Sequence, residues 1–112
     1  MDPRFSESGI TQYVSPVAGE QEKIVKASPG KLYYLRVANT TAARIFAFVF
    51  NAITNAGGPL MPPISIAPNS EVELVLPFPI QFSVGLVVGA STGATAYVAA
   101  GANSLQMLAI TK

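Results

Sequence analysis

The residue types that carry most enzyme chemistry are scarce in this chain. Its 112 residues include no cysteine and no histidine, which excludes a thiolate nucleophile, a disulfide, a Cys/His zinc site and a Ser-His-Asp triad within the chain. Of the six carboxylates, only Glu71 and Glu73 lie beyond residue 22, so a paired-carboxylate site would need one of them beside an acid of the leading segment. We interpret the protein as a non-enzyme, with no catalytic residue, no cofactor and no metal.

Two glycine-containing segments lack the spacing that nucleotide binding needs. Residues 28–31 end in Gly-Lys, but the upstream glycine and the following Ser or Thr of a phosphate loop are missing, and a strand pattern follows. Residues 89–95 lack the dinucleotide spacing and open no expected helix. We interpret the first segment as a turn and the second as a hairpin connection.

Aromatic side chains among cations leave two binding alternatives open. Five Lys or Arg residues lie between residues 23 and 44 without an acid, and Tyr33 and Tyr34 lie among them. Such a surface can neutralise phosphates and stack on bases, but a sequence pI near 8.0 is modest and aromatic residues on strands are usually core. The tyrosines could also stack on sugars, although no cluster of Asp and Asn accompanies them. Nucleic acid is therefore not the expected partner.

The spacing of apolar residues after residue 22 is typical of strands. Short runs of period-two alternation are separated about every ten residues by turns rich in Pro, Gly, Asn and Ser, and no helical period or internal repeat is visible. This pattern predicts an all-β protein, an antiparallel β-sandwich that is jelly-roll-like. Strands are expected at residues 23–27, 32–38, 44–50, 64–66, 71–76, 81–88, 96–99 and 105–111.

Local detail follows from the same pattern. Within residues 32–38, the odd-numbered positions are expected to share one face of the sheet. Residues 39–42 are expected to form the bend of a hairpin. Residues 45–50 are apolar on both faces, which predicts cover on both sides. Pro77 and Pro79 are expected to end the strand that precedes them.

The leading segment, residues 1–21, differs from the rest of the chain. It is rich in Ser, Gly, Pro and Glu with isolated apolar anchors, and it lacks the basic start and apolar core of a secretory signal. A solvated tail and an extended N-terminal docking arm both fit this composition. Residues 22–112 are expected to form one β-sandwich domain. The uncharged stretch at residues 74–111 is interrupted by Pro and Gly, which argues against a membrane span.

Charge is sparse and unevenly distributed. Asp, Glu, Lys and Arg make up 12% of the residues, against about 25% in a typical domain. Beyond residue 44 only Glu71, Glu73 and Lys112 are charged, so faces and edges there lack the charged side chains that keep isolated β proteins apart. The acidic leading segment also invites pairing with the basic half, within one subunit or between neighbours. We expect a homo-oligomer or a subunit of a larger shell.

Four motifs follow one another between residue 23 and residue 111. They are a strand of the form lysine, small residue, Gly, Leu, Tyr and a closing Asn, an aromatic strand, a Pro-Pro-Ile segment, and a Pro-Ile-x-Phe-x-x-Gly-Leu strand, at residues 26–39, 43–52, 62–64 and 77–86. Their order resembles that of small structural proteins of tailed bacteriophages. The motifs are turns and core positions, and residues 2–20 match no pattern of that group.

The resemblance implies a jelly-roll or related β-sandwich head protein, and more specifically a capsid decoration or cement subunit. Such a subunit binds the lattice of the major capsid protein as an oligomer, here a dimer or trimer, on the capsid exterior of the virion after synthesis in the host cytoplasm. No catalytic residue is implied. A phage tail or fibre module that binds a receptor is the main alternative, and a nucleic-acid-binding β domain is a further one.

Two groups of contact residues are expected. Capsid contacts are assigned to the leading segment, which would reach onto neighbouring capsid subunits, at Arg4, Phe5, Ile10 and Tyr13. Oligomer or surface contacts are assigned to the basic half, at Tyr34, Arg36 and Arg44. Weak contacts of this kind gain affinity when they are multiplied over a lattice, by about 10² to 10⁴ through effective concentration.

Overall fold

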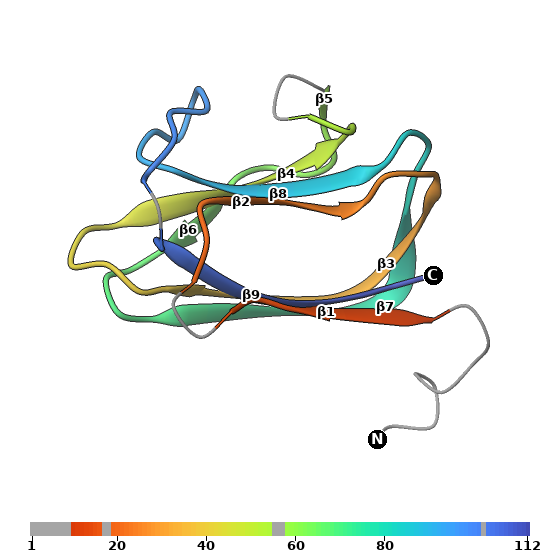
Figure 1. Ribbon diagram of the computed structural model, residues 1–112, viewed down its shortest axis with the longest axis horizontal. Helices are drawn as coiled ribbons and strands as arrows, with labels where there is room; N and C mark the ends of the chain where they lie inside the picture. The colour runs from red at the N-terminus through yellow and green to blue at the C-terminus, as the bar shows by residue number, and fades with distance from the viewer. Residues whose placement is uncertain (1–9, 17–18, 55–57, 102) are drawn as a thin grey trace.

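In the computed structural model, two antiparallel β-sheets pack face to face (Figure 1). The structure describes residues 10–16, 19–54, 58–101 and 103–112. Within these ranges the strands are β1 (Thr11–Val14), β2 (Glu22–Lys26), β3 (Gly30–Asn39), β4 (Ile45–Asn51), β5 (Gly58–Pro59), β6 (Ile64–Ile66), β7 (Glu71–Phe82), β8 (Leu86–Ser91) and β9 (Leu105–Thr111). The expected all-β sandwich is confirmed. The same ranges hold no helix long and apolar enough to cross a membrane.

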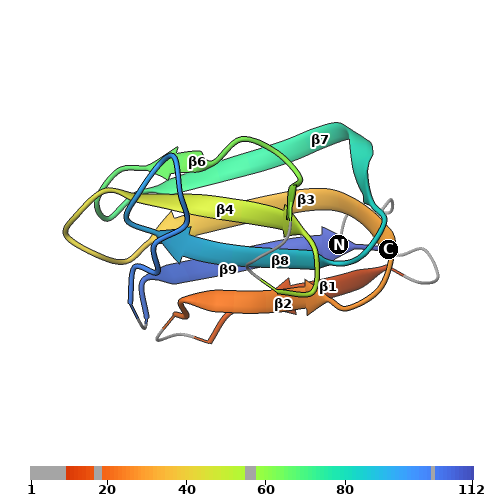
Figure 2. The same cartoon turned by 90° about the horizontal axis from the view of Figure 1, so that it is seen from above.

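The strand order follows a nested pattern. The first sheet has the order β1-β9-β3-β7, and the second has the order β2-β8-β4, with β5 and β6 both on the far side of β4 (Figures 1 and 2). β1 pairs with β9, β2 with β8, β3 with β7 and β4 with β6. These four pairs enclose one another, as in a long hairpin that is folded over into two layers. Strands far apart in the sequence therefore lie side by side throughout the molecule.

The core lies between the two sheets and receives side chains from both. Its fully buried members include Leu35 and Val37 of β3, Val49 of β4 and Val88 of β8. Burial of each such side chain stabilises the fold by about 1.5–3 kcal/mol. On β4 the residues that alternate with the core positions face outward, so period two places one half of this apolar strand on each face.

A bulge at Tyr33 changes which residues of β3 face inward. The register shifts between Leu32 and Tyr34 against both neighbouring strands, and Leu32 and Leu35 are both fully buried. An extra residue in one strand inverts the alternation beyond it. The expectation that Tyr33 shares a face with Leu35 and Val37 is therefore wrong, because the period-two pattern does not continue through the bulge.

The same irregularity accommodates the two prolines. On β7, Ile80 pairs with Leu32 and Val75 pairs with Tyr34, so Pro77 and Pro79 lie in the interval where the ladder is interrupted. β7 is an edge strand, and proline is tolerated there because no partner needs its missing N–H. The expectation that the prolines end the strand is wrong, since β7 continues through them.

The link between β3 and β4 is a crossing between sheets and not the expected hairpin, because these strands belong to different sheets. Asn39 holds this crossing. Its Nδ2 donates to the carbonyls of Ala43 at 2.7 Å and Ile66 at 3.1 Å, and its Oδ1 accepts from the amide of Thr41 at 2.9 Å. A buried amide side chain thus satisfies backbone groups that have no strand partner.

Two further expectations from the sequence differ from the structure. The strand expected at residues 81–88 is divided, because Phe82 ends β7 and a turn of three residues precedes β8. Residues 96–99 form no strand, and only an isolated bridge joins Ala99 to Ser91. The last strand, β9, lies where the alternation predicts it.

Candidate functional site

Part of the expected leading arm is a strand of the sandwich. β1 pairs with β9 along its whole length, and Glu20 exchanges two backbone hydrogen bonds with Leu105 at 2.7 and 2.9 Å. Among the expected capsid contacts, Arg4 and Phe5 lie outside the described residues, and Ile10 is partly buried immediately before β1.

Tyr13 faces the interior of the sandwich and packs against the core. Its hydroxyl donates to the carboxylate of Glu20, 2.7 Å from Oε1 and 2.8 Å from Oε2, and the Lys23 ammonium lies 4.9 Å from its ring centroid. Burial, followed by the neighbouring Glu20, raises the pKa of Tyr13 to about 12. These contacts anchor β1 and link it to the segment that enters the second sheet.

The expected surface contacts Tyr34 and Arg36 lie together on the outer face of the first sheet. The Tyr34 hydroxyl donates to Oε2 of Glu73, and Arg36 Nε lies 3.4 Å from Oε2 of Glu71. Burial and then Glu73 raise the pKa of Tyr34 above its usual value. Because acids of β7 match these groups, the face is less basic than the sequence of β3 suggests.

Arg44 lies apart from this pair, immediately before β4 of the second sheet. Its Nη1 donates to the hydroxyl of Ser65 at 2.6 Å. The basic half of the sequence is thus distributed over both sheets.

The outer face of the second sheet carries an aromatic cluster, formed by Phe48, Phe50 and Tyr97. The Tyr97 ring meets both phenylalanine rings edge-on at centroid distances of 5.6 Å. Gly89 lets the Tyr97 ring lie close to the backbone of β8, because a Cβ there would lie 2.7 Å from the Tyr97 hydroxyl. The loop that carries Tyr97 therefore supplies the cover that the two-sided apolar pattern of β4 predicts.

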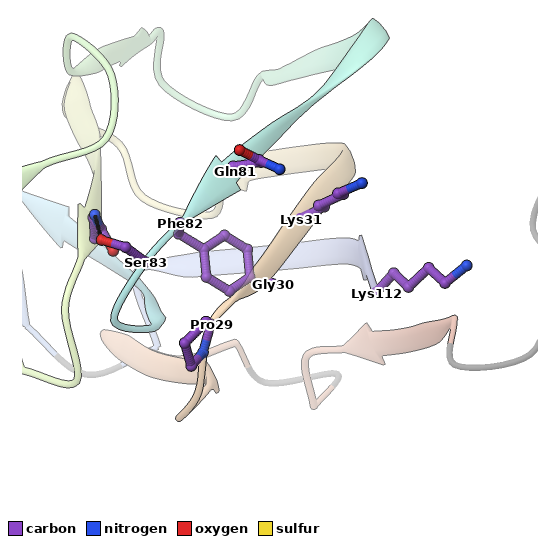
Figure 3. Close-up of a pocket in the computed structure, with 8 residues that line it drawn as sticks. Pro29, Gly30, Lys31, Gln81, Phe82, Ser83 and Lys112 are labelled. Atoms are coloured by element: carbon purple, nitrogen blue, oxygen red, sulfur yellow. Dashed lines mark hydrogen bonds between the residues drawn. The ribbon is translucent and has the colours of Figure 1, made fainter.

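One end of the sandwich is hollowed (Figure 3). This hollow, which we call the Lys31 hollow, has a volume of about 680 Å³. It is lined by residues from the turn before β3 and from the ends of β4, β7 and β9, namely Pro29, Gly30, Lys31, Asn51, Gln81, Phe82, Ser83 and Lys112. The buried ring of Phe82 lies beside Pro29 and Gly30 and closes the interior at this end (Figure 3).

Lysines gather at the Lys31 hollow. Lys31 and Lys112 exchange both backbone hydrogen bonds, at 2.9 and 3.0 Å, and their side chains extend in the same direction (Figure 3). The stem of Lys26 also reaches this place, because its Cε lies 2.9 Å from where a Cβ on Gly30 would be. Like charges brought together in this way repel one another and favour an anionic neighbour.

Aliphatic side chains stand beside the lysines. Val84 follows Ser83 of the hollow and is 48% exposed, and its amide donates to Asn51 Oδ1 at 3.0 Å. Ile53 is 50% exposed, and its Cγ2 lies 3.1 Å from a Cβ position on Gly85. This end of the molecule therefore combines positive charge with exposed apolar surface.

Sequence patterns do not find the Lys31 hollow. The Gly-Lys pair at residues 30–31 opens β3 itself, whereas the Gly-Lys of a phosphate loop leads into a helix. The site becomes visible only when β3, β7 and β9 are paired, because its lysines are separated by up to 86 positions in the chain. A useful signal would have been that Lys112 directly follows a strand that can pair with the start of β3.

Comparisons with protein families, with curated proteins and with solved structures found no match to this chain. In the described ranges, no group of three or more acidic residues is placed to hold a metal ion.

Proposed function

We propose that this protein is a viral structural subunit that decorates a phage head, binding the lattice of the major capsid protein through the surface of its β-sandwich. Strand order supports this proposal. The orders β1-β9-β3-β7 and β2-β8-β4, with β6 paired to β4, favour assignment to the jelly roll, an architecture found in viral capsid domains as well as in other protein classes. We propose the jelly roll as the specific type of this β-sandwich.

The observation that carries the proposal is the low density of charge on the surface. The accessible surface is 5795 Å² for thirteen charged side chains, or about 450 Å² for each. Exposed apolar side chains lie on several sides, including Val14 and Val75 on the first sheet and Phe78, 81% exposed, on the edge strand β7. Contact with several protein neighbours would remove such positions from water, as decoration of a lattice requires.

Co-sedimentation with phage heads tests the proposal. Purified protein is mixed with empty heads of the phage that carries its gene, and bound and free protein are separated by centrifugation. We expect saturable binding in a fixed ratio to the major capsid protein, together with a dimer or trimer mass for the free protein in solution. A monomer that stays in the supernatant at every concentration would overturn the proposal.

The capsid contacts assigned to Arg4 and Phe5 have a separate test. Deletion of residues 1–9 removes both residues and leaves β1 in place. If these residues bind the capsid, the shortened protein remains folded but loses at least tenfold in affinity for heads. Undiminished binding would leave the sandwich as the contact surface and exclude the leading residues.

A further inference from the structure

We infer that the Lys31 hollow is a docking site for an acidic segment of a partner protein that also carries large apolar side chains. The inference rests on the proposed function, since the partner would be a capsid subunit, and it adds the chemistry of the surface that is recognised. Three features support it: lysines lie at one end of the molecule, the acidic side chains have partners elsewhere, and exposed aliphatic side chains lie at the same end.

Lys31 and Lys112 are neighbours because the start of β3 pairs with the end of β9. The reciprocal backbone hydrogen bonds of Lys31 and Lys112 form a bonded antiparallel pair, in which Cα atoms are about 5.5 Å apart and side chains project to the same face. Gly30 allows a third lysine to approach, because any side chain there would collide with the Lys112 carbonyl at 2.5 Å and with the stem of Lys26 at 2.9 Å. Lys31 and Lys112 thus line one opening, and the stem of Lys26 passes close to Gly30 at the same end.

No carboxylate of the described residues forms an ion pair with Lys26 or Lys31. The four acids in those ranges have partners elsewhere in the fold, at Glu20, Glu22, Glu71 and Glu73. On β7, the two acids lie at the start of the strand, whereas the residue that pairs with Lys31 is Gln81 near its end. The molecule is therefore polarised along this strand, and its basic end is complementary to an anionic partner.

The apolar surroundings favour protein over nucleic acid. Single-stranded nucleic acid needs exposed rings for stacking, but the ring that lines the hollow, Phe82, is only 2% exposed. The neighbouring exposed groups are the aliphatic side chains of Ile53 and Val84. Aliphatic contacts beside lysines suit a peptide segment that alternates carboxylates with Leu, Ile or Val side chains.

The experiment uses a capped hexapeptide of four glutamates around two central leucines, added to the full-length protein labelled with ¹⁵N. We expect saturable shifts of the amide signals of Lys31, Gln81, Ser83 and Lys112, with affinity falling as salt rises. The same hexapeptide with lysines in place of the glutamates should cause no saturable shift. A twelve-residue oligothymidylate serves as the nucleic-acid probe.

Matched variants locate the site. The double variant Lys31→Glu with Lys112→Glu should weaken binding of the acidic peptide at least tenfold. Arg44→Glu reverses one charge away from the hollow, half the change of the double variant, and should alter affinity for the peptide less than twofold. Amide spectra of the free variants confirm that each is folded. Binding that survives the double variant, no shift with the acidic peptide, or tighter binding of the oligothymidylate at these amides would each overturn the inference.

Binding to phage heads, measured beside binding to the peptide, distinguishes failure of this inference from failure of the proposed function. If the wild-type protein binds the peptide but not heads, the proposed function fails and the acidic-peptide site stands. If the double variant loses the peptide but binds heads as the wild type does, the proposed function stands and the hollow is not the capsid contact. Loss of both peptide and head binding by the double variant, with Arg44→Glu still binding the peptide, is the result we expect.

Discussion

Asn39 illustrates how a single residue can organise a connection that has no regular structure. It is 2% exposed, and its side chain bonds to backbone groups of the β3–β4 crossing and of the end of β6. Polar atoms buried in this way stabilise the fold only while every partner is satisfied. The Asn39 amide therefore links the chain path between the two sheets to the end of β6.

Replacement of this amide should be costly. We expect Asn39→Ala to lower the free energy of unfolding by about 2–4 kcal/mol, because several buried carbonyl and amide groups lose their partner. Urea denaturation measures the change. As a control, Asn69→Gly alters an exposed asparagine at φ 52°, a conformation that glycine adopts freely, and should change stability by less than about 0.5 kcal/mol. Equal effects of the two substitutions would contradict this role.

Gly89 determines how closely the Tyr97 ring packs on the outer face of the second sheet. In Gly89→Ala the new Cβ would meet the Tyr97 ring at 2.7–3.0 Å, so the ring must leave Phe48 and Phe50. We expect a loss of about 1–3 kcal/mol and a weaker near-ultraviolet circular dichroism signal from the aromatic cluster. Gly58→Ala, where a Cβ would meet nothing within 4 Å, is the matched control. A silent Gly89→Ala would mean that Tyr97 does not rest on this glycine.

At the scale of elements, β1 and β7 are the two edges of the first sheet and are protected differently. β7 carries Pro77 and Pro79, which cannot donate to a foreign strand. β1 is only four residues long and is tied down by the bonds from Tyr13 and Ser15 to Glu20. Short length and proline both discourage edge-to-edge aggregation at this sheet.

Two truncations separate the strand from what precedes it. Deletion of residues 1–20 removes β1 and the contact of the partly buried Tyr13 with the core, and it uncovers the edge of β9. It should lower the free energy of unfolding by at least about 1 kcal/mol. Deletion of residues 1–9 removes no described strand and should change the free energy of unfolding by less than about 0.5 kcal/mol. Thermal and urea unfolding of both proteins measure the difference. Equal stability of the two truncations would show that β1 contributes nothing to the fold.

At the scale of the whole molecule, two tyrosines make the stability of the fold depend on pH. Burial raises the pKa of Tyr13 and of Tyr97 to about 12, with Glu20 and Glu22 as the neighbouring negative charges. In the unfolded chain these groups titrate near 10. Between pH 10 and pH 12 the folded state therefore retains protons that the unfolded state releases, and stability must fall as the pH rises through this window.

Alkaline titration checks this behaviour. We expect the urea midpoint to be insensitive to these tyrosines below pH 9 and to fall steadily above pH 10. Absorbance at 295 nm should show that Tyr13 and Tyr97 ionise only near pH 12. In the double variant Tyr13→Phe with Tyr97→Phe, the late absorbance change should disappear and the alkaline loss of stability should become shallower. Ionisation of Tyr13 and Tyr97 near pH 10 in the folded protein would contradict the burial that the structure describes.

Local pattern is sufficient for several features of this protein. Period-two alternation predicts the core face of β4, since side chains of a strand point alternately to its two sides wherever its partners lie. The same pattern predicts β9 and the outward Glu71 and Glu73 of β7. The missing cysteine and histidine exclude their chemistry without any knowledge of the fold. Sparse charge likewise characterises the surface before any strand is paired.

Other features, among them the bulge of β3 and the Lys31 hollow, depend on pairing between segments that are distant in the sequence. The bulge at Tyr33 is defined by the pairing of β3 with β9, and no local signal within β3 marks it. The lysines of the Lys31 hollow meet only because the start of β3 pairs with the end of β9. Alternation is a property of neighbouring residues, whereas register is a property of strands that meet across the chain. A sequence pattern therefore indicates which residues face inward, but it leaves open which ones become neighbours.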